Sequence, residues 1–216
     1  MTAIKNSSDL QILFENSDWL AVNKPTEISI HNTEDPQNLL SLFSQKMFPV
    51  HRLDKETSGV QILAKNERAA QQLAGIFQSR EVLKIYHGLL RGSLKTPTGV
   101  WNKPLSDKAE GRKNPQGVSA DRVPCETGYK VLQSNKFFTH CEFNLITGRQ
   151  HQIRKHTALE GHHLIGDPRY GDPKFNQKMA EIYKTSRLFL HCSSVTLMGQ
   201  KLEATVPTEF STLMSV

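Results

Sequence analysis

The residues best able to do chemistry in this chain lie in the run His51-Arg52-Leu53-Asp54-Lys55-Glu56-Thr57-Ser58-Gly59. This run places an imidazole, a guanidinium, carboxylates and two hydroxyls between Pro49 and an apolar stretch. One interpretation is a plain turn, in which Asp54 and the hydroxyls bond local backbone and Gly59 relieves a tight angle. The other is a loop that holds Asp54 rigidly as a reactive carboxylate. Spacing alone leaves both interpretations open.

A second segment, Thr147-Gly148-Arg149-Gln150-His151-Gln152-Ile153-Arg154-Lys155-His156, concentrates basic side chains and histidines without an acidic residue. We expect a helix over about 149–160, capped by Thr147 and ended by Gly161. The N-terminus of such a helix attracts anions, because its free N–H groups and its dipole add to the charge. The segment therefore suits phosphate.

Two other interpretations of that segment remain. Charged helices are commonly just solvated faces. A zinc site is a further alternative, because His151, His156, His162 and His163 are close in sequence. Their spacings do not match common helical ligand pairs and no cysteine lies beside them, so we expect no metal.

The elements that must position these segments follow from hydrophobic periodicity and turn residues. We expect strands over 10–15, 19–23, 60–65, 83–90, 128–132, 137–145, 188–191, 195–197 and 201–206. We expect helices over 39–47 and 66–79 in addition to 149–160. Residues 95–124 are rich in Gly, Pro and Lys, and predict a long excursion with one short hairpin. Strands and helices do not alternate regularly, which favours an α+β fold with a mixed, mostly antiparallel sheet.

Composition is that of an ordinary globular protein, with 37% hydrophobic and 22% charged residues. No apolar run approaches the roughly 20 residues of a membrane span, and residues 1–10 lack the pattern of a signal peptide, so we expect no export. The three cysteines lack paired spacing, which favours a reduced, cytoplasmic protein. A net charge of +6 permits a polyanionic partner without requiring one. We interpret residues 1–9 as a flexible leader and 10–216 as one domain.

Taken together, these segments resemble the RluA family of RNA pseudouridine synthases. Residues 51–59 reproduce the family motif His-Arg-Leu-Asp-x-x-Thr-Ser-Gly. The other matching segments, in the family's order, are Ala21-Val22-Asn23-Lys24-Pro25 with His31, Lys84-Ile85-Tyr86, the run 147–156, Ile165-Gly166-Asp167-x-x-Tyr170-Gly171 and Leu190-His191. The resemblance extends from about residue 10 to residue 207.

The resemblance implies a pseudouridine synthase fold with an active-site cleft across its sheet, and uridine isomerisation in ribosomal or transfer RNA without a cofactor. It implies catalytic roles for Asp54, Tyr86 and Arg149. It implies RNA contact or base flipping by Arg52, Lys24, His51, Thr57, Arg154 and Lys155. The expected partner is an RNA stem-loop, bound by a monomer with no obligatory protein partner and no membrane. We expect a catalytic domain alone, without the S4 RNA-binding domain of many relatives.

Two departures from the family pattern stand out. Glu27 takes the place of a glycine two residues after the Lys-Pro pair, so this loop could sit differently. Cys192 replaces an alanine after Leu190-His191, which should be harmless. Two rival functions are an RNA-binding protein that has lost activity, and a two-histidine phosphoesterase built from His31-Asn32-Thr33 and His191-Cys192-Ser193.

Overall fold

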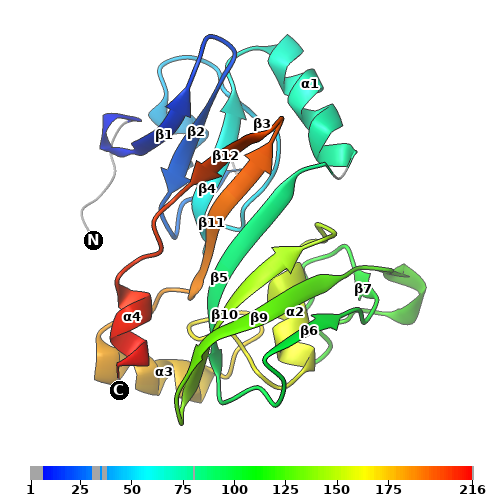
Figure 1. The fold of residues 1–216 in the computed structure, drawn as a ribbon, viewed down its shortest axis with the longest axis vertical. Helices are drawn as coiled ribbons and strands as arrows, with labels where there is room; N and C mark the ends of the chain where they lie inside the picture. Colours follow the sequence, from blue (N-terminus) through cyan, green and yellow to red (C-terminus); the bar gives the residue numbers. More distant parts are fainter. Residues whose placement is uncertain (1–6, 31–34, 36–37, 80, 216) are drawn as a thin grey trace. The chain divides into compact units, whose positions relative to one another are not determined.

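The structure is a computed structural model that describes residues 7–30, 35, 38–79 and 81–215 (Figure 1). The chain divides into two compact units. Unit 1 consists of residues 1–84 and 192–205, and unit 2 of residues 85–191 and 206–216. The expected domain 10–216 includes residues of both units, and its extent stays a prediction. Of the expected leader, residues 1–6 lie outside the described residues, and Ser7–Asp9 form a 3-10 turn.

Unit 1 is built on β-strands. Its strands are β1 (Gln11–Glu15), β2 (Trp19–Lys24), β3 (Phe48–Pro49), β4 (Ser58–Ala64), the part of β11 (Leu190–Leu197) from Cys192, and β12 (Gln200–Glu203). Their order is β1-β2-β4-β11, with β3 on β4 and β12 on β11. Every residue of β4 is buried, which matches the apolar strand predicted from the sequence. Strand β4 is therefore a rigid base for the loop that precedes it.

The helix of unit 1, α1 (Glu67–Gln78), confirms the prediction made for 66–79. Asn66 caps it by accepting a hydrogen bond from the N–H of Ala69 at 2.9 Å. Ala69 and Leu73 are its buried residues, and the helix packs against β3 and β4 (Figure 1).

The helix predicted over 39–47 was wrong. Only a 3-10 turn, Leu40–Leu42, is present there, and Phe43 is already extended. Asn38 explains the outcome, because its side chain accepts from the N–H of Leu40 at 2.8 Å and its carbonyl accepts from the hydroxyl of Ser41 at 2.7 Å. Such local side-chain bonds favour a turn over a helix that has few residues in which to nucleate.

Unit 2 contains the antiparallel strands β5 (Leu83–Arg91, from Ile85), β10 (Phe138–Leu145), β9 (Thr127–Ser134) and β6 (Thr98–Trp101), in that order. The predicted excursion 95–124 contains β6 and a small hairpin of β7 (Leu105–Ser106) and β8 (Arg122–Val123), with a 3-10 turn at Ser119–Asp121. The helices are α2 (Gln152–Leu159), α3 (Pro173–Tyr183) and α4 (Glu209–Met214). In Figure 1, α3 and α4 lie together, and α2 lies behind the strands of this unit.

Helices α3 and α4 form the core of unit 2 together with its strands. The buried cluster contains Leu89, Phe138, Ile165, Met179, Phe189, Phe210, Leu213 and Met214. Both helices were missed by the sequence analysis, and β11 is a single strand where two were expected. The α+β fold class is confirmed. None of the helices in the described part of the chain is long and apolar enough to cross a membrane.

Candidate active site

Asp54 begins a tight turn directly before β4. Its carbonyl accepts a hydrogen bond from the N–H of Thr57 at 3.1 Å, as the plain-turn interpretation expects. The turn ends on Gly59, whose φ of +115° is open to glycine but not to other residues. A Cβ at Gly59 would overlap the carbonyl oxygen of Cys192. The turn is thus fixed by close contact between two strand backbones, and Asp54 is half-buried at its start.

Lys24 holds this turn in place through hydrogen bonds. Its side chain is fully buried, and its ammonium donates to the carbonyl oxygens of Pro25 (2.9 Å), Ile28 (3.0 Å) and Lys55 (3.1 Å). The hydroxyl of Thr26 adds a bond to the carbonyl of Glu56 at 2.6 Å. The buried ammonium of Lys24, surrounded by carbonyls, thus holds the chain around Asp54 in place, and its contact with RNA stays a prediction.

His51 also has internal partners. Its Nε2 accepts from the N–H of Ile62 at 2.9 Å, its carbonyl accepts from Gln61, and its ring stacks on Phe77 with 4.6 Å between centroids. These contacts fix the loop against β4, and the RNA contact of His51 stays a prediction. Thr57 is buried, and its hydroxyl has no hydrogen-bond partner among the described residues. Arg52 is exposed.

Glu27 resolves the first departure from the family pattern. Its backbone has φ of +64°, in the left-handed region where a glycine would be unstrained. The loop therefore takes, at some cost in strain, a backbone conformation at residue 27 that a glycine would adopt without strain. His31 lies outside the described residues.

In unit 2, Tyr86 lies on β5 opposite Phe143 of β10, which is in turn opposite Tyr129 of β9. Directly opposed residues share one face of a sheet, so the three rings form an aromatic row. Tyr86 is 7% exposed. It is thus a ring held firmly by its neighbours, with a small part accessible.

Arg149 lies in the loop before α2 rather than in its first turn. The predicted start of this helix at 149 and its cap at Thr147 were wrong, because α2 starts at Gln152 and His151 takes the cap position with φ of +56°. The cause is the side chain of Gln152. Its Oε1 accepts from the N–H of Arg149 (3.0 Å) and the hydroxyl of Thr147 (2.7 Å).

The amide nitrogen of Gln152 completes the arrangement by donating to the carbonyl of Glu126 (2.9 Å) and the hydroxyl of Thr127 (2.8 Å). One buried amide thus joins the Arg149 loop to the start of β9. Sequence reasoning missed Gln152 as a functional residue. The signal was its place within the 147–156 run.

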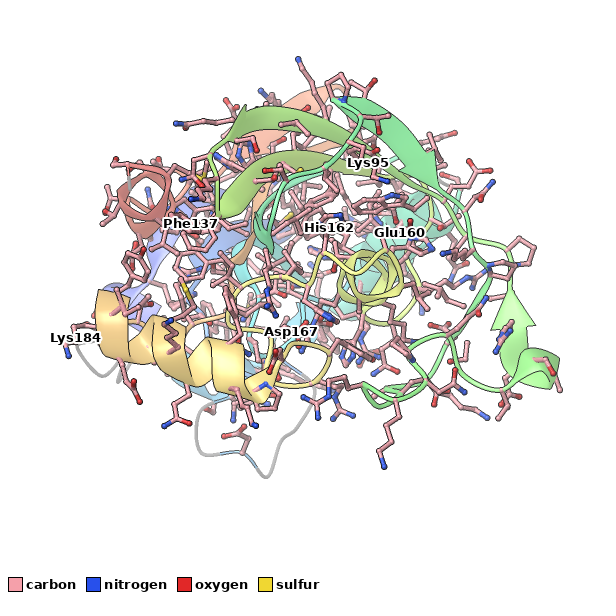
Figure 2. The ribbon with its side chains drawn as sticks, turned by 90° about the horizontal axis from the view of Figure 1, so that it is seen from below. Lys95, Phe137, Glu160, His162, Asp167 and Lys184 are labelled. Atoms are coloured by element: carbon pink, nitrogen blue, oxygen red, sulfur yellow. The ribbon has the colours of Figure 1, made fainter. Side chains whose placement is uncertain are left out.

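Arg154 is fully buried and makes a two-pronged ion pair with Asp167, with distances of 2.8 Å and 2.9 Å. Burial opposes ionisation of Asp167, but the hydrogen bonds and charge of Arg154, with backbone N–H donors, lower the pKa of its carboxyl below the ordinary value. Figure 2 views α2 nearly end-on and shows Asp167 beside the start of α3. The guanidinium of Arg154 also lies 5.5 Å from the ring of Tyr170, whose hydroxyl lies 2.9 Å from Nδ1 of His151. Arg154 thus has a structural partner in Asp167, and its RNA role stays a prediction.

Lys155 is likewise fully buried. Its ammonium donates to the carbonyl oxygens of Ser106 (2.8 Å) and Lys108 (2.7 Å). As with Lys24, the protein encloses this charge, and the contact of Lys155 with RNA stays a prediction. Arg149 is 33% exposed, and its Nη1 lies 3.8 Å from Oδ2 of Asp107.

No group of three metal-ligating side chains comes together within the described ranges. Of the histidines considered for zinc, His151 contacts Tyr170, while His156 lies against Thr127 (2.9 Å) and the carbonyl of Lys103 (3.0 Å). Burial lowers the pKa of His156, which is therefore held as a neutral imidazole.

The predicted site residues fall in both units. Arg52 and Asp54 lie in unit 1, and Tyr86 and Arg149 lie in unit 2. Within each unit the structure holds the candidate side chain in a loop or strand fixed by buried polar contacts.

Comparison with known proteins adds an independent line. The model of the family described as RNA pseudouridylate synthase matches residues 18–159. A ribosomal large subunit pseudouridine synthase C of Vibrio vulnificus is 34% identical over 206 residues, covering 90% of this chain and 64% of that protein. A tRNA pseudouridine synthase C of Vibrio cholerae is 31% identical, covering 88% of this chain and 85% of that protein. The chain spans less than two thirds of the length of the ribosomal relative.

Two solved human structures share the fold. RNA pseudouridylate synthase domain containing 1 superposes with a TM-score of 0.75 over 96% of this chain and 85% of that one. RNA pseudouridylate synthase domain containing 4 gives a TM-score of 0.76, covering 93% and 90%. Both are 24% identical in sequence.

Proposed function

Because this chain belongs to the RNA pseudouridylate synthase family, we propose that it isomerises uridine to pseudouridine in RNA. In this reaction the C1′–N1 bond breaks, the uracil turns, a C1′–C5 bond forms, the C5 proton leaves to solvent and N1 takes up a proton from solvent. The observation that carries the proposal is the turn at Asp54, which holds a half-buried carboxylate beside a fully buried strand.

Asp54 is the proposed reacting group. The proposal requires its side chain in the carboxylate form. The carboxylate either attacks C1′ as a nucleophile or removes the C2′ proton to give a glycal. Both routes need the carboxylate close to the ribose, which the Gly59 contact and the Lys24 bonds support by fixing the turn.

Tyr86 and Arg149 are the proposed partners of Asp54. The ring of Tyr86 offers a flat face for the uracil and a phenol that can exchange a proton at C5. The guanidinium of Arg149 is proposed to stabilise negative charge during the reaction. The aromatic row behind Tyr86 and the Gln152 bonds behind Arg149 support these roles by limiting side-chain movement.

Arg52 is the proposed base-flipping residue. It is exposed, and a guanidinium can both stack in the gap left by the flipped uridine and bind phosphate. Flipping costs a few kcal/mol and is least costly in loops and single strands. We propose that Thr57, whose hydroxyl has no hydrogen-bond partner among the described residues, also contacts the RNA.

The proposed substrate is a stem-loop of ribosomal or transfer RNA, since the relatives are described as acting on one or the other. We propose that the protein acts in the cytoplasm as a monomer without an obligatory protein partner and without a cofactor. The test is tritium release from RNA labelled at C5 of uridine and purified from cells that lack the gene, with pseudouridine mapping in the same cells. Release and a missing pseudouridine are expected; no release from any cellular RNA would refute the proposal.

A further inference from the structure

We propose that Asp107 is a positioning residue for Arg149, held in place by the buried ammonium of Lys155. This inference rests on the proposed function, because it concerns how the active-site guanidinium is fixed. It assigns a positioning role to one residue of the excursion 95–124.

The carboxylate of Asp107 contacts two residues of the loop before α2, Arg149 and Gln150. Its Oδ1 accepts a hydrogen bond from the N–H of Gln150 at 2.7 Å, a short distance typical of charge-assisted bonds. Its Oδ2 lies 3.8 Å from Nη1 of Arg149. One carboxylate therefore fixes the backbone after Arg149 and also attracts its guanidinium.

Asp107 is itself held on both sides. The carbonyls that Lys155 binds belong to Ser106 and Lys108, the two chain neighbours of Asp107. Both Lys155 and Ser106 are fully buried, and a buried ammonium must keep its acceptors because an unpaired buried charge is very unfavourable. Lys155 thus fixes the direction in which Asp107 leaves the backbone, and Lys155 lies on α2, which Arg149 precedes.

The excursion around Asp107 is compact enough to hold the side chain of Asp107 in place. Gly117, with φ of +80°, packs so closely that a Cβ would lie 2.5 Å from the hydroxyl oxygen of Ser106. Its carbonyl accepts two bonds from Arg122, at 3.0 Å and 2.6 Å. The hairpin β7–β8 closes the segment, so Asp107 is supported by an ordered structure.

Arg149 needs such a partner because its loop lies outside the helix. Gln152 holds its backbone from one side only. The Nε of Arg149 is buried and has no hydrogen-bond partner among the described residues. The contact at Nη1 therefore contributes to the orientation of the guanidinium, and misplacing a catalytic group by about 1 Å can lower a rate up to about 100-fold.

The test compares Asp107→Ala and Asp107→Asn with Asp121→Ala as the matched control. Asp121 is a carboxylate of the same excursion that pairs with Lys108 at 2.7 Å and touches nothing in the Arg149 loop. We expect Asp107→Ala to lower the single-turnover rate about tenfold while RNA affinity changes less than about twofold. Asp107→Asn should fall between, since its amide oxygen can still accept from Gln150. A rate for Asp107→Ala equal to that of Asp121→Ala would overturn the inference.

A second readout does not depend on activity. Hydrogen exchange of the Gln150 amide, followed by NMR, should be faster in Asp107→Ala and unchanged in Asp121→Ala. Equal protection in all variants would overturn the inference even if rates changed. Wild-type protein that releases no tritium would refute the proposed function instead, and the exchange measurement would then decide the role of Asp107 alone.

Discussion

Replacing Lys24 with methionine tests whether a fully buried lysine of the first motif holds the Asp54 turn or binds RNA. Methionine keeps the length and removes the three N–H donors. The carbonyls of Pro25, Ile28 and Lys55 would each lose a donor, and a buried polar group left unpaired costs about 1–3 kcal/mol. The bond to Ile28 is buried and the other two are partly buried. Relief of the ammonium's desolvation offsets part of the loss.

The expected net destabilisation of Lys24→Met is therefore about 3 kcal/mol, or a fall of roughly 10 °C in Tm for a chain of this size. Lys55→Met is the matched control. It removes a half-exposed ion pair with Asp35 at 2.7 Å, worth at most about 1 kcal/mol. Thermal and urea unfolding measure both variants, and RNA affinity is measured below the transition. Unchanged stability with weakened RNA binding would show that Lys24 reaches the RNA and that the reasoning is wrong.

Three further predictions concern buried charge and backbone strain. Burial, with repulsion from His87, lowers the pKa of His140 to about 4. The contribution of neutral His140 to stability is therefore complete above the ordinary pKa of about 6.5 and is lost as pH falls towards 4. NMR titration should show His140 neutral at pH 5, and a midpoint near 6.5 would contradict this. Glu27→Gly should raise stability by about 1 kcal/mol in urea unfolding by relieving a left-handed backbone, whereas a loss would show that its side chain matters more than its φ. Asp167→Asn should destabilise by about 3–5 kcal/mol, because it leaves the buried guanidinium of Arg154 unpaired; a loss below 1 kcal/mol in the same assay would show that this charge is solvated.

The sequence predicted most strands correctly because their patterns are local. Strand β4 is a short apolar run, and α1 combines a capping asparagine at 66 with apolar residues at helical spacing. Helix α3 carried similar signals, since Asp172 caps it and Pro173 occupies its first turn, but these were overlooked. The helix expected over 39–47 failed because Asn38 and Ser41 bond local backbone instead.

The site shows where sequence reasoning ends. Motif positions identified Asp54, Tyr86 and Arg149 as candidates, but not the partners of the motif cations. In the sequence, Lys24 and Lys155 cannot be told apart from RNA-binding lysines. Only the fold reveals that backbone carbonyls enclose both ammonium groups. Which side chain is buried depends on tertiary contacts between distant segments, and residue type and spacing do not encode this directly.

The central claim is that the carboxylate of Asp54 carries out the reaction, and Asp54→Asn tests it most directly. The change is isosteric and removes the charge, so the fold and RNA affinity should be retained. Single-turnover tritium release should fall at least about 10⁴-fold, since an amide can neither attack C1′ nor remove a proton. Release by Asp54→Asn within about tenfold of wild type, in protein that melts and binds RNA normally, would contradict the account.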